Sequence, residues 1–406
     1  MSSRMEHPTG RKIALSFAST NFLYLFIQFF IFVYLPIYLK DIGFLPDRIG
    51  LLIGVYSFAM IPIIAPFGII SDKFSPKRLV QSGILLTALW IIGLSFSRNF
   101  TGFFLSMIVG GAGLTMFTVS IQSLYYKHIS DSSRGKKVGV FLMSGFLGFS
   151  LGPITGGFIL RYYDMHVLFI TAILLSLVLF ILSTTLKDSS PIRSEFLEYK
   201  KDINKPEMML FLLLVMVLGT HFGVEQTNFP PLLKEKINLS SSQIGGVYGV
   251  VGIWLGALIL VIGHIFDVKR NLFMLFFWGL VVSGIFQALT PLAWSFGSVL
   301  TFRLFHTVGD GLVIMLNGIV MSTIFPNKRL GGNTGLLLAV RSVGVTTGAL
   351  VCGSLNRVFS SYSIPFFLSG GSLVILSLFL LSKRRIFRGV WQVKEKPVVV
   401  IESIQE

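Results

Sequence analysis

Twelve long runs of apolar residues, separated by short polar breaks, follow one another along the 406-residue chain. About 20 apolar residues in a helix cross the hydrocarbon core of a bilayer, and only helices or closed barrels satisfy their backbone hydrogen bonds there. The sequence lacks the alternating strands of about 10 residues that build a membrane barrel. We therefore predict an all-α membrane protein with twelve spans: Ile13–Tyr38, Ile49–Ile70, Leu79–Phe96, Phe100–Ser123, Val138–Leu160, His166–Thr185, Met208–Leu232, Ser242–Phe266, Leu272–Leu292, Phe296–Ile319, Thr334–Leu355 and Ile364–Leu381.

The longest polar stretch divides these spans into two sets of six. It mixes both charge signs and has a proline near each end, which is typical of a surface linker. We predict an N-terminal six-helix bundle over residues 1–186 and a cytoplasmic linker over 187–207. A C-terminal six-helix bundle over 208–383 and a cytoplasmic tail over 384–406 complete the chain.

Lys and Arg concentrate in the tails and in the loops on the same side as the tails. By the positive-inside rule, both termini are cytoplasmic in a multi-pass protein of the cell (inner or plasma) membrane. The net charge of +16 does not indicate a nucleic-acid partner, because the bases lie in short loops and tails rather than in a folded basic domain. The lipid bilayer is the expected environment.

The composition supports this assignment. The chain is 53% hydrophobic and 13% charged, with a mean hydropathy of +0.78, unlike a soluble domain. Its single cysteine, Cys352, excludes a disulfide framework or a thiolate metal site. The first apolar run is too long for a signal-peptide core, so we interpret it as the first span. We expect no enzyme activity, cofactor, metal site or ATP hydrolysis.

The two halves resemble each other when the sequence is shifted by about 195 residues. The segment "PIYLKDIGFLPDRIGLLIG" from Pro36 then aligns with "PPLLKEKINLSSSQIGGVYG" from Pro230. Two six-helix repeats with a cavity between them are the pattern of a secondary transporter. The same shift aligns several glycines of the fifth and eleventh spans: Gly139, Gly148, Gly152 and Gly157 with Gly335, Gly344, Gly348 and Gly353.

The loop after the second span carries Gly68-x-x-x-Asp72-Lys73-x-x-x-Lys77-Arg78. This pattern resembles the signature between helices 2 and 3 of the major facilitator superfamily, although Ser75 stands where a second glycine is usual. The resemblance covers Ile13 to about Arg384 and implies a transporter of two six-helix bundles. We predict a cytoplasmic gate in which an acid at a helix end faces neighbouring bases; the alternative is that the bases only set topology. Its members are Gly68, Asp72, Lys73, Lys77, Arg78 and Arg134, with Asp267, Lys269 and Arg270 in the second half.

The fifth span contains a second motif, which resembles the pattern of antiporters in this family. Small residues let helices approach closely, and a proline removes one backbone hydrogen bond and bends the helix. The alternative is a packing face that carries no information on transport direction. The motif residues are Gly139, Gly148, Gly152, Pro153, Gly156 and Gly157.

Two expectations from the family are not met. Many drug–proton antiporters of this superfamily have an acid in helix 1 and an Arg in helix 4, and neither is present here. The first span offers only uncharged polar residues, among which Asn21 and Gln28 are candidates for substrate binding. If protons drive transport, they must use other residues.

Ionisable side chains inside the predicted spans occur only in the second half, where each costs at least about 2.5–3.5 kcal/mol on insertion scales. The corresponding positions of the first half are apolar or glycine, so the scaffold does not require these charges. A rise of 1.5 Å per residue places Glu225 and Arg303 at similar heights, with both histidines just below. The residues are His221 and Glu225 in helix 7, Arg303, His306 and Asp310 in helix 10, and Arg341 in helix 11.

These heights suggest a Glu225–Arg303 pair and an Asp310–Arg341 pair. We assign proton coupling to Glu225 and Asp310, with His221 and His306 as relays. Arg303 and Arg341 are counter-charges or anchors for an anionic substrate. Purely structural pairs, or groups facing water-filled crevices, are the alternative interpretation.

The function predicted from these features is secondary active transport of a small organic solute by alternating access, in a monomer. Proton-coupled efflux by antiport is the first choice. Proton symport that takes up a small organic acid or metabolite is the second, and a non-transporting receptor or assembly factor on the same scaffold is a third possibility.

Overall fold

The computed structural model describes residues 8–62, 75–128, 134–189, 206–268, 272–324 and 330–385. Within these ranges the chain is helical and has no strands. Eleven of the helical segments are long and apolar enough to cross a membrane. The helices are α1 (Pro8–Phe32), α2 (Leu35–Asp41), α3 (Pro46–Phe58), α5 (Pro76–Phe96), α6 (Phe100–His128), α7 (Arg134–Ile159), α8 (Met165–Ser183), α10 (Pro206–Pro231), the π-helix η2 (Leu232–Lys236), α11 (Ser241–Val268), α12 (Leu272–Leu289), the 3₁₀-helix η3 (Thr290–Leu292), α13 (Phe296–Ile324), α14 (Leu330–Phe359) and α15 (Ser363–Ser382).

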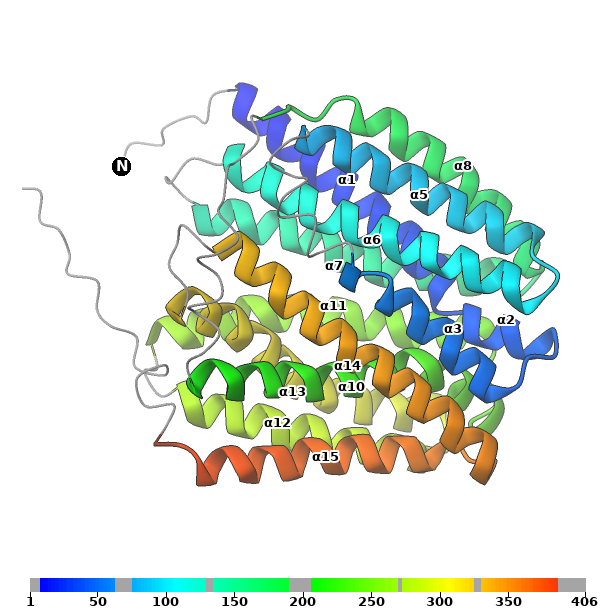
Figure 1. Cartoon of the computed structure of the whole chain (residues 1–406), viewed down its shortest axis with the longest axis vertical. Coiled ribbons are helices and arrows are strands. Elements are labelled where there is room, and N and C mark those ends of the chain that lie inside the picture. Colours follow the sequence, from blue (N-terminus) through cyan, green and yellow to red (C-terminus); the bar gives the residue numbers. More distant parts are fainter. Residues whose placement is uncertain are drawn as a thin grey trace, which may run out of the picture.

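The predicted all-α membrane fold is therefore confirmed. The second predicted span, Ile49–Ile70, begins within α3, and its part beyond residue 62 lies outside the described residues. In Figure 1 the long helices run side by side across the molecule. The end at which α1 begins and α15 ends is called the tail end below, and the end that holds α2 is called the far end.

Both halves break their first long helix near a proline. The first predicted span, Ile13–Tyr38, is divided at Val33 and Tyr34, after which Pro36 lies in the first turn of α2. In the second half, α10 ends at Pro231 and continues as η2. Proline has no backbone N–H and clashes with the preceding turn, which explains an interruption at equivalent places of the two repeats.

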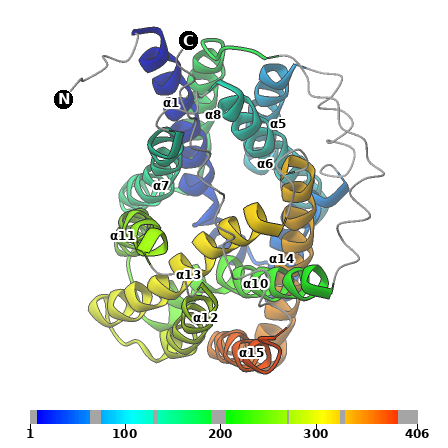
Figure 2. The same cartoon turned by 90° about the vertical axis from the view of Figure 1, so that its left-hand side faces the viewer.

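Figure 2, viewed from the tail end, shows α1, α5, α6, α7 and α8 grouped on one side and α10, α12, α13 and α15 on the other. The two groups meet where α7 lies beside α11 and where α3 lies beside α14. At these junctions glycine permits backbone contact between the halves. A Cβ added at Gly157 would lie 2.3 Å from the carbonyl oxygen of Ser241, and one at Gly353 would lie 2.6 Å from that of Pro46.

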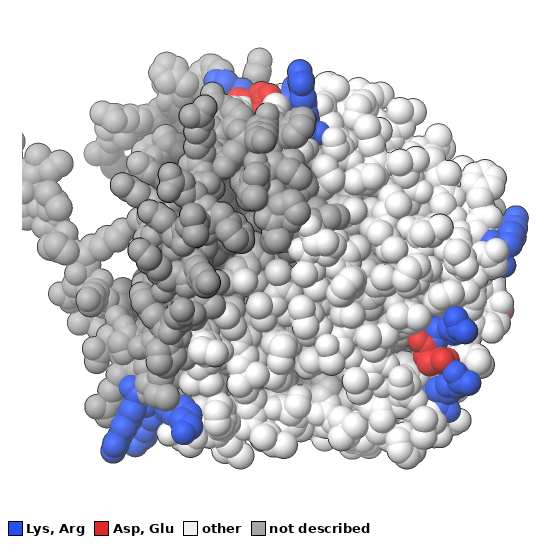
Figure 3. All heavy atoms as spheres, viewed as in Figure 1, with Lys and Arg blue, Asp and Glu red and all other residues white. Residues whose placement is uncertain are grey.

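The surface between the two ends is apolar. Figure 3 shows charged side chains of the described residues near the ends of the helices and a wide uncharged band between them. Large apolar side chains such as Leu174, Ile181 and Ile375 are exposed in this band. Exposed apolar area on this scale is expected of a lipid-facing surface and not of a soluble protein.

Candidate functional site

A buried cluster of charged side chains joins α10 to α13. His221 and Glu225 lie one turn apart on α10, and α13 contributes Arg303 and His306. Glu225 Oε1 forms an ion pair with Arg303 Nη2 and lies 3.1 Å from His306 Nε2. The predicted Glu225–Arg303 pair is therefore present in the structure, and one imidazole joins it directly.

Asp310, one turn further along α13, completes the cluster. Its Oδ2 lies 3.2 Å from His306 Nε2, and its Oδ1 lies 3.9 Å from His221 Nε2. Ser283 of α12 donates a hydrogen bond of 2.7 Å to Asp310 Oδ1. His306 thus lies between the two carboxylates, within contact of both.

Polar groups of neighbouring helices hold the cluster in place. His306 Nδ1 donates to the carbonyl oxygen of Ser283 at 2.9 Å, so neutral His306 has its free lone pair on Nε2. His221 Nδ1 lies 3.2 Å from Ser369 Oγ on α15. Arg303 donates to Gln287 Oε1 at 3.0 Å, and its guanidinium lies over the ring of Phe229. Each buried charge or imidazole thereby has a supporting polar or aromatic partner, as burial requires.

The predicted Asp310–Arg341 pair was wrong. The described side chains show no ion pair between these two residues, because Asp310 faces the histidines and Ser283 instead. Arg341 has its guanidinium 4.6 Å from the ring centre of Phe222, and its side chain is exposed. Arg341 is thus available to a solute.

A cavity of about 170 Å³ lies between the two halves. Its polar lining includes Gln28, Tyr56, Gln226, Arg341 and Ser342, contributed by α1, α3, α10 and α14. Tyr56 donates to Gln28 Oε1 at 2.7 Å, which fixes the amide of Gln28 at the cavity wall. The cavity therefore offers one exposed cation and several hydrogen-bonding groups to a molecule that enters it.

Of the two polar candidates in the first span, only Gln28 lines this cavity. Asn21 donates to the carbonyl oxygen of Phe141 at 3.1 Å and to Ser144 Oγ at 3.2 Å, both on α7. Its amide is satisfied within the first bundle and joins α1 to α7. The prediction that Asn21 lines the solute site is not supported by these contacts.

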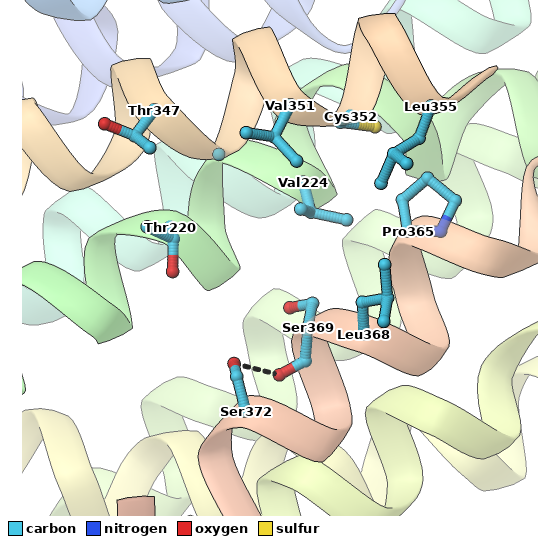
Figure 4. A pocket seen from close by; sticks show the side chains of 11 residues that line it. Thr220, Val224, Thr347, Val351, Cys352, Leu355, Pro365, Leu368, Ser369 and Ser372 are labelled. Atoms are coloured by element: carbon cyan, nitrogen blue, oxygen red, sulfur yellow. Dashed lines mark hydrogen bonds between the residues drawn. The ribbon is translucent and has the colours of Figure 1, made fainter. Parts of the chain in front are cut away.

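A second, largely apolar pocket of about 170 Å³ opens between α10, α14 and α15 (Figure 4). Ser372 donates to the carbonyl oxygen of Ser369 at 2.7 Å, the interaction marked in that view. Because Ser369 also contacts His221, this pocket adjoins the charged cluster from its outer side. The sequence carries no signal for it, since its lining residues are ordinary apolar and small side chains.

At the far end, ion pairs cross between the halves. Lys40 pairs with Glu235, and Lys234 Nζ lies 2.8 Å from Asp41 Oδ2. We refer to these two as the crossed ion pairs. A third pair joins Arg357 of α14 to Asp47 of α3. The sequence analysis missed all three pairs, although its own alignment of the repeats places Lys40 opposite Lys234.

Most of the predicted gate lies beyond what the structure describes. Gly68, Asp72, Lys73, Lys269 and Arg270 are outside the described residues, and the side chains of Arg134 and Asp267 are not described either. The gate therefore remains a prediction.

The described part of this loop contacts the end of the first bundle. Lys77 Nζ donates to the carbonyl oxygen of Thr184 at 2.6 Å, and Arg78 donates its backbone N–H to Ser75 Oγ at 3.2 Å. Partial burial acts to raise the pKa of Asp188, but hydrogen bonds from Ser75 and from the backbone of Ser189 and Lys77 outweigh it and lower that pKa.

The glycine motif of α7 packs against α1. A Cβ added at Gly148 would lie 2.4 Å from the carbonyl oxygen of Phe22, and one at Gly152 would lie 2.5 Å from that of Phe26. Real side chains do not approach so closely, so these positions require glycine for this packing. Gly139 differs, because an added Cβ there meets no atom within 4 Å, and its predicted packing role was wrong.

The other motif residues lie where α7 nears the second half. A Cβ added at Gly156 would lie 2.9 Å from the carbonyl oxygen of Phe30. Tyr34 donates its hydroxyl to the carbonyl oxygen of Pro153 at 2.7 Å and lies 3.2 Å from that of Ser241 on α11.

The second half repeats this packing at aligned glycines. A Cβ added at Gly344 would lie 2.1 Å from the carbonyl oxygen of Met216, and one at Gly348 would lie 2.1 Å from that of Thr220. Helix α14 thus packs against α10 as α7 packs against α1. The repeat inferred from the sequence is reproduced in three dimensions.

Comparison with known proteins agrees with this geometry. Residues 17–276 and 207–398 match the family model "Major Facilitator Superfamily". The quinolone resistance protein NorA of Staphylococcus aureus (strain COL) is 26% identical over 379 residues, covering 86% of this chain and 91% of the relative.

Solved structures show the same fold. The nucleoside transporter NupG superposes with a TM-score of 0.73 at 16% identity, covering 93% of this chain and 99% of the other. A D-xylose–proton symporter superposes with a TM-score of 0.73 at 15% identity, covering 90% and 96%. The third possibility, a non-transporting receptor, is set aside by these matches. The chain therefore belongs to the Major Facilitator Superfamily and is a multi-pass secondary active transporter, not an enzyme.

Proposed function

We propose that this transporter exports a small organic solute in exchange for protons, with Glu225 and Asp310 as the proton carriers. The observation that supports this most strongly is the buried cluster, in which His306 lies between both carboxylates. The carboxylates keep 14% and 11% of their side-chain surface exposed, so protons and water can reach them. Both imidazoles are fully buried.

The coupling follows from the cost of isolated buried charge. When Arg303 pairs with Glu225, the carboxylate is compensated and remains ionised. A movement of α13 relative to α10 that separates them leaves a buried charge without a partner. Protonation removes that cost, so the conformational change and proton uptake are linked. His306 and His221 can pass the proton between Glu225 and Asp310.

The direction of transport is proposed from two features. The relative NorA is named for resistance to quinolones, and a membrane transporter confers resistance by lowering the internal drug concentration. The α7 motif resembles that of antiporters. We propose that the cavity lined by Gln28 and Arg341 holds the solute and that Arg303 serves as counter-charge.

The state described here is closed at the far end by the crossed ion pairs. Since Lys and Arg gather at the tail end, we propose that both termini lie in the cytoplasm and that this state faces inward. A single chain contains both halves of the cavity, so we propose that it works as a monomer.

A second candidate is proton-driven uptake of an organic anion. Arg341 favours it, because an exposed guanidinium in the cavity without an acidic partner suits a carboxylate substrate.

Flux measurements in proteoliposomes test these proposals. A pH-sensitive dye reports proton movement while a fluorescent quinolone and a set of organic acids are offered under pH gradients of both signs. We expect solute efflux to be coupled to proton entry, and Glu225→Gln and Asp310→Asn each to abolish the coupling. Asp164→Asn, which neutralises a carboxylate at the N-terminus of α8, is the matched control and should leave it intact. Normal coupling in both cluster variants would contradict the proton assignment, and solute uptake together with protons would favour the second candidate.

A further inference from the structure

The charged cluster also has the composition of a metal site. One ligand atom from each of His221, Glu225, His306 and Asp310 can be chosen so that all four lie within 4.8 Å of one another. Each helix supplies a His and an acid one turn apart, so two short motifs face each other across α10 and α13. The sequence analysis expected no metal, because the motifs are separated by more than 80 residues and their rotation about the helix axes was unknown.

The spacing suits a four-coordinate transition ion. Ligands about 2.0–2.1 Å from a tetrahedral Zn²⁺ lie roughly 3.3 Å from one another. His306 Nε2 is 3.1 Å from Glu225 Oε1 and 3.2 Å from Asp310 Oδ2, which already matches. His221 Nε2 is 4.0 Å from Glu225 Oε1 and 3.9 Å from Asp310 Oδ1. A shift of roughly half an ångström by the His221 ring would complete the tetrahedron.

The histidines are oriented as metal ligands are. Nδ1 of His306 is held by the carbonyl oxygen of Ser283, and Nδ1 of His221 contacts Ser369 Oγ. Outer partners of this kind fix the ring so that Nε2 faces the ion. Both imidazoles are fully buried, and among the described residues neither Nε2 has a hydrogen-bond partner. A buried nitrogen without a partner carries a desolvation cost that a bound ion would remove.

We propose that His221, Glu225, His306 and Asp310 bind one divalent transition-metal ion of the Zn²⁺ type. Two imidazoles and two carboxylates favour such an ion over Mg²⁺ or Ca²⁺, which prefer oxygen ligands. The partly exposed carboxylates give the ion access. Arg303 opposes it, because its cation shares Glu225. The ion uses the same atoms as the protons of the proposed antiport, so bound metal and proton exclude each other.

Binding is measured on the purified chain in detergent, without gradient or solute, after treatment with a chelator. Calorimetric titration with Zn²⁺ is expected to show one ion per chain with micromolar or tighter affinity, and titration with Mg²⁺ none. His221→Gln and His306→Gln should each weaken Zn²⁺ binding at least tenfold. His166→Gln, a histidine of α8 outside the cluster, is the matched control and should not change it.

Arg303→Gln gives the opposite sign and separates a specific site from general damage. Removing the competing cation should tighten Zn²⁺ binding severalfold, whereas a distorted protein would bind less in every variant. Co²⁺ should show the intense visible absorption of a four-coordinate ion. Absent binding in the wild type, unchanged affinity in both cluster histidine variants, or a six-coordinate Co²⁺ spectrum would each overturn the proposal. Proton flux measured without metal tests the antiport proposal separately, so either proposal can fail alone.

Discussion

Lys40 and Lys234 occupy aligned positions of the two repeats, and each pairs with the acid that follows the other. Lys40 contacts Glu235, while Lys234 Nζ lies 2.8 Å from Asp41 Oδ2. The exchange is that of a two-fold symmetric interface, in which residue i contacts j and j contacts i. The duplicated sequence thereby supplies both halves of its own closure at the far end.

Removing both lysines should favour opening at the far end. Each of these partly exposed ion pairs contributes up to about 1 kcal/mol, so Lys40→Gln with Lys234→Gln should raise the open population by up to roughly 30-fold. The buried residue Ile37, changed to cysteine in a Cys352→Ala background, reports opening through its labelling rate with an impermeant maleimide. Exchanging the charges, with Lys40→Glu and Glu235→Lys, should restore slow labelling. An unchanged rate in the double lysine variant would show that the pairs do not hold this end closed.

The Glu225–Arg303 pair should show strong coupling in thermal stability. Glu225→Gln leaves a buried guanidinium without its partner, and loss of one partner of a buried pair costs about 3–5 kcal/mol. Neutralising both residues should recover most of that loss. A double-mutant cycle on melting in detergent measures the coupling energy, and additive single effects would argue against a functional pair.

The glycines of α7 should respond differently to a single added methyl group. Gly148→Ala places a Cβ against the backbone of α1 and should cost about 1–3 kcal/mol. Gly139→Ala, in the same helix but with open space around it, should be neutral or slightly stabilising. Melting temperatures of the two variants provide the comparison. Equal effects would mean that the α1–α7 contact is looser than the structure shows.

Arg341 should affect the affinity for the solute more than the stability of the protein. Its guanidinium lines the cavity and has no ion-pair partner among the described residues, so Arg341→Gln removes a cation without leaving a buried acid. We expect at least tenfold weaker binding of anionic solutes and little change for cationic ones. Equilibrium binding of both classes checks this, with Arg161→Gln at the far end as control. Equal losses for both classes would exclude charge recognition by Arg341.

The sequence predicted the helices, the repeat and the Glu225–Arg303 pair because these depend on apolar run length, on alignment and on height along a helix. Height says nothing about rotation around the helix axis. For this reason Asp310 was assigned to Arg341, whereas Asp310 faces His306 and Arg341 faces the cavity.

Other features were missed because they depend on which groups meet after packing. Asn21 was expected to line the cavity, but α7 supplies a backbone carbonyl that takes its amide. The far-end ion pairs join loops distant in sequence, and their charges could equally have been solvated.

Tyr34 has one hydroxyl proton and two carbonyl oxygens within reach, that of Pro153 in its own half and that of Ser241 in the other. If the halves tilt, the proton can pass from one acceptor to the other while a hydrogen bond persists throughout. Such an exchange would let this contact act as a pivot, turning without ever stripping a polar group bare.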